Sequence, residues 1–414
     1  MSSRTAAPTE AEPLRILMIS DVYFPRVNGV STSMQTFRRE LQALGHAVTL
    51  VVPDYGVAHD CDDDDIIRIP SRQVLLDPED RLMRRRAILE LLPWLRTQGY
   101  DLVHIQTPFV AHYLGLRLAR ELRLPVVESY HTFFEEYLFH YIPFLPRAWL
   151  RAVARRFSRW QCNSVDSVVV PSTAMLEVLR GYGVRSAARI IPTGIELAEF
   201  RHGDGSAFRH RHGIPAARPV LTFVGRVAFE KNIDFLLRML VRVRQEVPDV
   251  LLVIAGEGPA VSHLHALSAR LSLQDNVLFI GYMSRCGELQ DCYAAGDIFV
   301  FASRTETQGL VLLEAMALGV PVVSTAVMGT RDVVHAGEGA IIAPADEAGF
   351  AAAVTCLLRN PARRQALGEA ARVYAAGWAA PLLAQRLAEH YVAVVAADAV
   401  AREPAGTADA CLPG

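Results

Sequence analysis

The chain has 414 residues, of which 51% are hydrophobic and 21% are charged. At roughly 100–200 residues per domain, this length predicts two or three domains, and the apolar content excludes global disorder. The 42 basic and 44 acidic residues nearly balance, so the composition does not indicate a nucleic-acid-binding protein, which would show a basic excess. Lys231 is the single lysine, and every other basic residue is an arginine.

The six cysteines are scattered without a Cys-x-x-Cys pair. This spacing favours free thiols in a reducing compartment and predicts no metal site. The acidic run at residues 62–65 is interpreted as a solvated loop. Asp21 interrupts the first apolar run too early for a secretory signal, and no apolar stretch approaches the ~18–20 residues of a membrane-spanning helix. We therefore expect a cytoplasmic or peripheral protein.

Short apolar runs alternate with helical patterns along the first half of the chain. The strands expected there are residues 14–19, 48–52, 101–105, 125–129 and 167–170. After the first strand, Ser31, Thr32 and Ser33 are expected to cap a helix that Gly45 ends. Strands separated by helices indicate parallel pairing in a doubly wound sheet.

The pattern restarts after a polar stretch at residues 204–212 that shows no apolar period. The strands expected beyond it are residues 219–224, 250–255, 276–280, 298–302 and 321–324. We predict an α/β fold of two Rossmann-like domains, residues 14–200 and 201–377, which face a central cleft where ligands bind. A helix at about 378–400 is expected to pack back on the first domain, with residues 1–13 flexible and residues 403–414 disordered.

Two cations follow one strand of the second domain. Gly225 permits a tight exit from that strand, and Arg226 and Lys231 are then expected to project into the cleft. A guanidinium fork and a compact ammonium together suit a diphosphate group. Either cation alone could be an ordinary surface residue, but the only lysine of the chain stands here. That position favours a specific role for Lys231.

Two carboxylates follow another strand of the second domain. Glu306 lies on the loop and Glu314 lies inside the next helix, and the amides of Gln308, Gly309 and Leu310 mark the helix N-terminus. A helix N-terminus is a natural phosphate site. A carboxylate at the position of Glu314 can accept hydrogen bonds from both ribose hydroxyls, and it would be costly to bury without a partner.

Two features of the first domain are weaker signals. Gly29 lies in the first strand-to-helix turn, where it would place backbone N–H groups opposite the phosphates. His131 follows the expected strand at 125–129, at the edge from which cleft-facing side chains emerge. A structural and a functional role for His131 are both open. Many aromatic residues follow it up to Tyr141.

A stripe of arginines recurs every four residues and would lie on one face of a helix. Its members are Arg147, Arg151, Arg155 and Arg159. With Trp149 and Trp160 on the same segment, this pattern suits an anionic membrane surface, which predicts a peripheral location on the inner face of the cell membrane. The alternative is a solvated charged face.

Taken together, these motifs resemble the retaining glycosyltransferases of family 4, which have the GT-B fold and carry a two-glutamate motif, here Glu306 and Glu314. Further segments that fit the family, in the expected order, are residues 192–195, 225–231, 255–259 and 279–282. The resemblance covers about residues 14–380. Thr193 stands where the family commonly has asparagine, and residues 329–332 replace the usual paired glycine and glutamate.

The resemblance implies a hexosyltransferase that moves glucose or mannose from a nucleotide-diphosphate sugar with retention of configuration, without a metal or other cofactor. The residues that it implies as catalytic are His131, Arg226, Lys231 and Glu306. Those that it implies as donor-binding are Gly29, Gly225, Gly256, Tyr282, Thr307, Gln308, Gly309, Leu310 and Glu314.

The segment at residues 131–137 is similar to that of bacterial diacylglycerol glucosyltransferases. This favours a lipid acceptor such as diacylglycerol, with Phe133, Tyr137 and the arginine stripe near the acceptor or the membrane. A soluble or polyprenyl-linked saccharide acceptor stays open. A non-catalytic nucleotide-sugar or lipid-binding protein is disfavoured by the intact charged residues. A pyridoxal-phosphate phosphorylase would need a second lysine, and a nicotinamide-dependent oxidoreductase would need a Gly-x-Gly-x-x-Gly motif.

Overall fold

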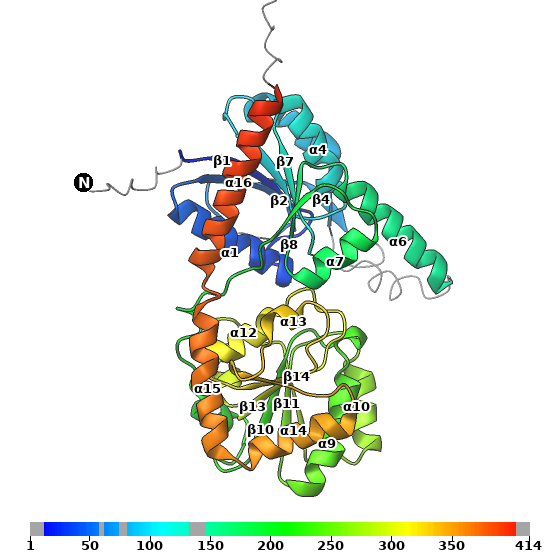
Figure 1. The fold of residues 1–414 in the computed structure, drawn as a ribbon, viewed down its shortest axis with the longest axis vertical. Coiled ribbons are helices and arrows are strands. Elements are labelled where there is room, and N and C mark those ends of the chain that lie inside the picture. Colours follow the sequence, from blue (N-terminus) through cyan, green and yellow to red (C-terminus); the bar gives the residue numbers. More distant parts are fainter. Residues whose placement is uncertain (1–11, 58–61, 74–80, 132–145, 403–414) are drawn as a thin grey trace, which may run out of the picture.

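The computed structural model describes residues 12–57, 62–73, 81–131 and 146–402. They form two α/β units, one above the other in Figure 1. The N-domain comprises the described residues up to Ile190 together with the last helix, and the C-domain comprises residues 205–376. The expectations for residues 1–11 and 403–414 lie outside the described residues.

The N-domain is built on a parallel sheet in the order β3-β2-β1-β6-β7-β8-β9. Its strands are β1 (Arg15–Ile19), β2 (Ala47–Pro53), β3 (Ile66–Ile69), β6 (Leu102–Ile105), β7 (Val126–Ser129), β8 (Ser167–Val170) and β9 (Ala187–Ile190). Its helices are α1 (Gly29–Ala43), α2 (Arg85–Glu90), α3 (Leu92–Leu95), α4 (Val110–Leu122), α6 (Arg147–Cys162), α7 (Thr173–Gly181) and α16 (Ala380–Arg402). A short antiparallel pair joins β4 (Ser71–Gln73) to β5 (Arg81–Met83).

Side chains of the N-domain sheet alternate between two separate cores. Leu17 and Ile19 of β1 belong to one core, and Ile16 and Met18 belong to the other. Helices therefore cover both faces of the sheet (Figure 1). This arrangement explains the continuous apolar runs of the central strands, because strands of a doubly covered parallel sheet are buried on both sides.

The C-domain is built on a second parallel sheet, in the order β12-β11-β10-β13-β14-β15. Its strands are β10 (Val220–Val224), β11 (Leu251–Ala255), β12 (Val277–Gly281), β13 (Ile298–Phe301), β14 (Val322–Ser324) and β15 (Ala340–Ile342). Its helices are α8 (Gly205–Arg211), η1 (Phe229–Lys231), α9 (Ile233–Glu246), α10 (Val261–Arg270), α11 (Glu288–Ala294), α12 (Leu310–Ala317), α13 (Thr330–Val333), α14 (Glu347–Leu358) and α15 (Pro361–Ala376). The two parallel sheets confirm the predicted α/β fold class.

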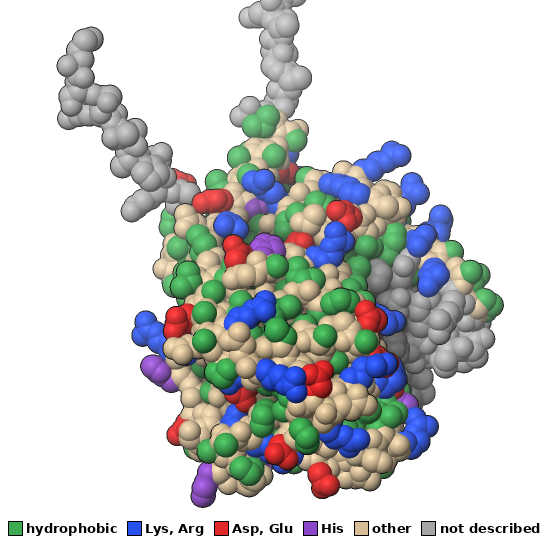
Figure 2. Space-filling model, turned by 60° about the horizontal axis from the view of Figure 1, so that its bottom comes forward, with side chains coloured by type: hydrophobic (Ala, Val, Ile, Leu, Met, Phe, Trp, Pro, Cys, Tyr) green, Lys and Arg blue, Asp and Glu red, His purple; other side chains and the backbone are tan. Residues whose placement is uncertain are grey.

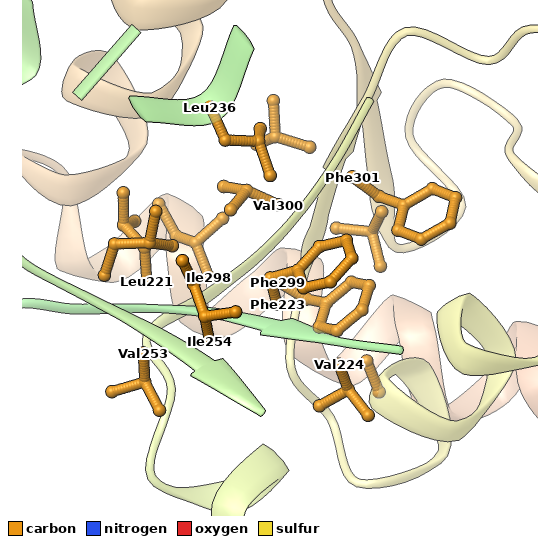
Figure 3. Close-up of a cluster of buried hydrophobic side chains, with 14 of the residues drawn as sticks. Leu221, Phe223, Val224, Leu236, Val253, Ile254, Ile298, Phe299, Val300 and Phe301 are labelled. Atoms are coloured by element: carbon orange, nitrogen blue, oxygen red, sulfur yellow. The ribbon is translucent and has the colours of Figure 1, made fainter. Parts of the chain in front are cut away.

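Aromatic side chains fill one face of the C-domain sheet. Phe223 of β10 stacks on Phe301 of β13 with ring centroids 5.9 Å apart, and Phe301 stacks on Phe299 at 6.1 Å. Figure 3 shows Val300 on the opposite side, toward Leu236 of α9. The two-residue period of β13 thus places its aromatic side chains on one face of the sheet and its aliphatic side chains on the other.

The chain crosses between the domains twice, and the two crossing segments lie side by side. The amide of Ile195 donates to the carbonyl of Trp378 at 2.9 Å, and the amide of Ala380 donates to the carbonyl of Ile195 at 2.9 Å. Gly194 permits this approach, because a Cβ there would lie 2.4 Å from the Cα of Ala380. Beyond the second crossing, α16 packs against α1 of the N-domain (Figure 1).

Two local predictions are wrong. Helix α1 begins at Gly29 and its cap is Asn28, whose side chain accepts from the amides of Val30 and Ser31; an asparagine in extended geometry supplies this acceptor one turn before the predicted serines. The polar stretch at 204–212 forms α8, because Asp204 caps it and the fully buried Phe208 anchors it to the C-domain core. The edge strands β3, β9 and β15 were not predicted.

Charges on the surface are mostly interspersed. Figure 2 shows basic and acidic side chains mixed over the lower face of the C-domain. The acidic run is more than a solvated loop: Asp62 pairs with Arg68 at 2.7 Å, and Asp63 pairs with Arg38 at 2.5 Å. None of the helices in the described part of the chain is long and apolar enough to span a bilayer.

Candidate active site

The loops with the predicted motifs meet at one edge of the C-domain sheet. Strands β10, β11, β12 and β13 are parallel, so their carboxyl ends share an edge. Figure 1 places α12 and α13, which follow β13 and β14, on the side of the C-domain that faces the N-domain. The predicted motif residues of the C-domain therefore face the N-domain.

Lys231 and Glu306 form an ion pair at this edge. The ammonium nitrogen of Lys231 donates to both carboxylate oxygens of Glu306, at 2.5 and 2.8 Å. Their side chains are only 19% and 16% exposed. Asn232 holds this loop on β13, because its side-chain amide donates to the carbonyl of Ala302 at 3.1 Å. The glutamate and the lysine predicted from separate motifs therefore touch.

Two glycines bring the backbone close together at the ends of β10 and β11. Gly225 and Gly256 have φ of 149° and 137°, and a Cβ on Gly256 would lie 1.9 Å from the carbonyl oxygen of Gly225. Only glycine tolerates this geometry without strain. Arg226, which follows Gly225, is exposed. An exposed guanidinium on the loop after β10 is available to an anionic ligand.

The N-terminus of α12 lies on the loop after β13. Gly309 caps this helix with φ of 98°. The amide of Leu312 donates to the carbonyl of Gly309 at 3.0 Å, whereas Leu310 is the first residue of the helix and its amide has no acceptor inside it. The amide of Gly329 donates to the carbonyl of Glu306 at 2.9 Å, and a Cβ on Gly329 would lie 1.9 Å from the carbonyl oxygen of Thr307. The loop from Glu306 to Gly309 is thus held against the segment before α13.

Glu314 is buried in α12 with two partners. Its carboxylate accepts from the hydroxyl of Tyr293 at 2.7 Å and from the guanidinium of Arg285 at 2.9 Å. Burial and the neighbouring Glu314 raise the pKa of Tyr293 well above its ordinary value, so this hydroxyl donates. Arg285 also lies over the ring of Phe200, 5.8 Å from its centroid. Glu314 is therefore compensated and held in one orientation.

A cavity of about 380 Å³ lies between the domains beside Glu314. From the N-domain side it is lined by Thr32 and Thr36 of α1, and from the C-domain side by Tyr282 and Leu310. Tyr282 is 61% exposed. The cavity therefore joins predicted donor-binding residues with α1.

Two glutamates of the first crossing segment also line the cavity. Desolvation and the nearby Glu196 carboxylate raise the pKa of Glu199 to about 7. Glu196 itself forms an ion pair with Arg39 of α1. The cavity wall next to Arg285 is therefore acidic.

His131 lies at the N-domain edge, two residues after β7. Its Nε2 is 3.1 Å from the side-chain oxygen of Gln106. Burial lowers the pKa of His131 to about 4, so the imidazole is neutral at physiological pH. Its hydrogen-bond partner belongs to the N-domain, not to the Lys231–Glu306 pair. Gly29 is the exposed first residue of α1.

The arginine stripe lies on α6, which projects from the N-domain at the right of Figure 1. Arg151, Arg155 and Arg159 are exposed on this helix. The guanidinium of Arg155 lies over the ring of Tyr182, 5.6 Å from its centroid. Trp149 is 56% exposed. The predicted residues Phe133 and Tyr137, and the side chain of Arg147, lie outside the described residues.

The sequence analysis did not identify Arg285, Tyr293 or Gln106. Arg285 and Tyr293 become partners of Glu314 through the packing of α11 and its preceding loop on α12. A signal for Gln106 was present, because His104 interrupts the apolar run that precedes it. Within the described ranges, no three His, Cys, Asp or Glu side chains gather as a metal site would require.

Comparison with known proteins agrees with this geometry. Residues 27–199 match the family model "Glycosyltransferase Family 4", and residues 205–374 match "Glycosyl transferases group 1". An alpha-monoglucosyldiacylglycerol synthase of Streptococcus pneumoniae is 36% identical over 319 residues, which cover 75% of this chain and 71% of that protein. The chain belongs to the family 4 glycosyltransferases.

Other proteins similar to this glycosyltransferase have names that specify other sugars or products. A GDP-mannose-dependent alpha-mannosyltransferase of Mycobacterium tuberculosis is 30% identical over 92% of this chain and 97% of its own length. The structure of a sucrose-phosphate synthase from Thermosynechococcus elongatus aligns with a TM-score of 0.75 and 22% identity, over 93% of this chain and 100% of that one. The enzyme has the GT-B fold and is a hexosyltransferase that uses a nucleotide sugar.

Proposed function

We propose that this glycosyltransferase is a retaining enzyme that transfers glucose or mannose to a lipid acceptor such as diacylglycerol, at the cytoplasmic face of the membrane. The observation that carries the proposal is the Lys231–Glu306 ion pair at the domain-facing edge of the C-domain. The synthase relative from Streptococcus pneumoniae supports the lipid acceptor. Its name specifies an α-linked product, and the sugar of UDP-glucose is also α-linked, so such a transfer retains configuration.

The donor's nucleotide fits the cavity beside Glu314. Tyr293 and Arg285 each occupy one position on a carboxylate oxygen, and a carboxylate offers about four acceptor positions. Glu314 can therefore also accept from ribose hydroxyls. The diphosphate would then lie toward Arg226, Lys231 and the amides at the N-terminus of α12.

The leaving diphosphate gains negative charge as its bond to the sugar breaks. Arg226 and Lys231 would oppose this charge, together with the N-terminus of α12. Glu306 holds Lys231 in place before the donor binds, and it is proposed to reach the donor sugar. His131 is proposed to lie beside the same sugar from the N-domain.

We propose that no metal ion is required, because two cations and a helix N-terminus suffice to balance a diphosphate. Full transferase activity in excess EDTA is expected. Strict dependence on Mn²⁺ or Mg²⁺ would overturn this part of the proposal.

The lipid acceptor would be reached through α6. This helix presents exposed arginines together with Trp149 and the 52%-exposed Trp160, a combination suited to an anionic headgroup layer. Figure 2 shows basic and hydrophobic side chains side by side at the right edge, beside the grey residues. Attachment would be peripheral.

Mannose is named beside glucose because the GDP-mannose-dependent mannosyltransferase relative matches this chain over almost its whole length. The test is to incubate the purified protein with UDP-glucose, GDP-mannose and other nucleotide sugars, with diacylglycerol vesicles or with soluble and polyprenyl-linked saccharides. The proposal expects a glycosylated diacylglycerol with an α linkage. Transfer only to a saccharide would refute the lipid acceptor, and hydrolysis or binding without transfer to any acceptor would refute the function.

A further inference from the structure

A buried hydrogen-bond chain leads from α16 to His131. The hydroxyl of Tyr391 lies 2.6 Å from Nδ1 of His104, and the side-chain nitrogen of Gln106 lies 3.0 Å from the same atom. The side-chain oxygen of Gln106 then lies 3.1 Å from Nε2 of His131. Tyr391 is fully buried, and His104 is 1% exposed.

The proton positions along this chain follow from its donors. Burial raises the pKa of Tyr391 well above its ordinary value, so its hydroxyl stays protonated. The side-chain nitrogen of Gln106, which lies 3.0 Å from Nδ1 of His104, can only donate. Nδ1 of His104 must then be an acceptor, and the proton of this neutral ring is on Nε2, which lies 2.9 Å from the hydroxyl of Ser129. The opposite tautomer would point the Nδ1 proton at the amide nitrogen of Gln106, so that two donors would face each other in the core.

The orientation of the Gln106 amide determines which nitrogen of His131 carries the proton. The amide nitrogen of Gln106 faces His104, and its amide oxygen faces His131. A carbonyl oxygen only accepts, so Nε2 of His131 carries the proton. The Nδ1 atom of His131 is then the acceptor of that ring.

We propose that Tyr391, His104 and Gln106 are positioning residues that hold His131 in the Nε2–H tautomer and in one orientation. The inference rests on the proposed function, in which His131 lies beside the donor sugar. Nδ1 of His131 then accepts a hydrogen bond from a hydroxyl of that sugar. The last helix of the chain thereby acts on the reacting end of the N-domain without touching substrate.

The first experiment reads the tautomer directly. The ¹⁵N shifts of His131 in the full-length enzyme without substrate are expected to show a protonated Nε2 and an unprotonated Nδ1 at neutral pH. In Gln106→Leu this preference is expected to disappear, and in Tyr391→Phe the Nδ1–H form is expected to grow. A protonated Nδ1 in the unaltered enzyme, or an unchanged tautomer in both variants, would overturn the proposal.

The second experiment separates positioning from packing. Tyr391→Phe removes only a hydroxyl and is expected to lower kcat about tenfold while the KM for the donor stays within about twofold. His390→Gln is the matched control: His390 is also buried in α16, but its ring bonds to Ser167 at 2.9 Å instead of to the chain. Equal losses in both variants would mean that docking of α16 alone matters.

The third readout is the pH profile. The titratable groups that face His104 are Tyr391, His131 and His390. Burial lowers the pKa of His131. Gln106→Glu places a carboxylate against His131 and is expected to move the acidic limb of kcat to higher pH. An unmoved limb contradicts the contact. If the unaltered enzyme transfers no sugar at all, the proposed function fails, whereas the tautomer measurement still decides the positioning chain.

Discussion

At the residue scale, the candidate site consists of charged groups whose partners come from other elements. Lys231 of η1 is held by Glu306, which lies on the loop after β13. Glu314 of α12 is held by Tyr293 of α11 and by Arg285 on the loop that precedes α11. Each pair is mostly shielded from solvent, so loss of one partner leaves an uncompensated charge. Single substitutions at these positions should therefore have large effects.

Replacement of Lys231 by alanine tests the leaving-group role. We expect kcat/KM to fall on the order of 10²-fold or more, the scale seen when one stabiliser of transition-state charge is removed. Steady-state kinetics with the preferred donor measures this, and circular dichroism checks the fold. Arg242→Ala, which removes an exposed arginine on α9, is the control and should leave kcat/KM unchanged. Near-normal turnover of a folded Lys231→Ala enzyme would refute the assignment.

Buried His104 should make the protein less stable in mild acid. Burial lowers its pKa from 6.5 to about 3, so between these values the unfolded chain binds a proton that the folded chain does not. The contribution of neutral His104 to the free energy of unfolding is therefore complete above pH 6.5 and is lost as the pH falls toward 3. At about pH 5 the loss reaches about 2 kcal/mol.

The measurement compares urea unfolding at about pH 7.5 and about pH 5 for the unaltered chain and for His104→Gln. Asp21 and Glu199, whose pKa values are each raised to about 7, oppose this trend, but they are present in both proteins and cancel in the comparison. The unaltered chain should lose more stability on acidification. Equal losses would show that His104 titrates normally in the folded protein.

At the element scale, α6 differs from the other helices of the N-domain. It buries Leu150, Ala154 and Ser158 against the domain, whereas its other faces carry exposed arginines and tryptophans. Trp160 packs on Tyr113 with ring centroids 5.7 Å apart, so part of its ring is committed to the protein. The exposed face with Trp149 is the surface that a membrane would meet.

Substitution of the stripe tests membrane attachment. Each arginine near an anionic surface contributes about 1 kcal/mol, so four contribute about 4 kcal/mol before screening. The unaltered protein should sediment with anionic vesicles and be released as salt rises, whereas the variant with glutamine at all four positions should stay in solution. The four positions are Arg147, Arg151, Arg155 and Arg159.

The control exchanges four exposed arginines elsewhere for glutamine, which gives the same change in net charge. These are Arg242, Arg270, Arg363 and Arg386. This control should still sediment with anionic vesicles. Equal release of both variants would mean that overall charge, not α6, binds the vesicles, and no binding of the unaltered protein at low salt would favour a soluble saccharide acceptor.

At the scale of the whole molecule, specific bonds connect the domains across the cleft. The side chain of Gln308 bonds to both backbone groups of Thr193, at 2.7 and 2.8 Å, and the hydroxyl of Thr193 lies 2.7 Å from that of Ser33 in α1. Asp332 of α13 accepts from the amide of Thr173 at the start of α7, at 2.5 Å. The two departures from the family pattern, at Thr193 and at residues 329–332, thus both lie at domain contacts.

Removal of the Gln308 contact should loosen the cleft. Gln308→Ala deletes the two hydrogen bonds that tie the C-domain to the crossing segment at Thr193, which we expect to raise the KM for the donor about tenfold with a smaller change in kcat. Small-angle scattering should show a larger radius of gyration. Gln365→Ala, at an exposed glutamine of α15, is the control. An unchanged KM and radius would show that other contacts fix the domain arrangement.

The sequence by itself determined the fold class and the identity of the main charged groups. Continuous apolar strands separated by helices require a covered parallel sheet, and the solitary Lys231 and the spacing of Glu306 and Glu314 are local features. Only the tertiary structure decided which groups meet. Arg285 reaches Glu314, and Tyr391 reaches the chain that ends at His131, because packing joins segments far apart in sequence. The side-chain oxygen of Asn28 decided where α1 begins, and burial of Phe208 decided that residues 205–211 form a helix. Neither effect can be seen in the local periodicity of the sequence.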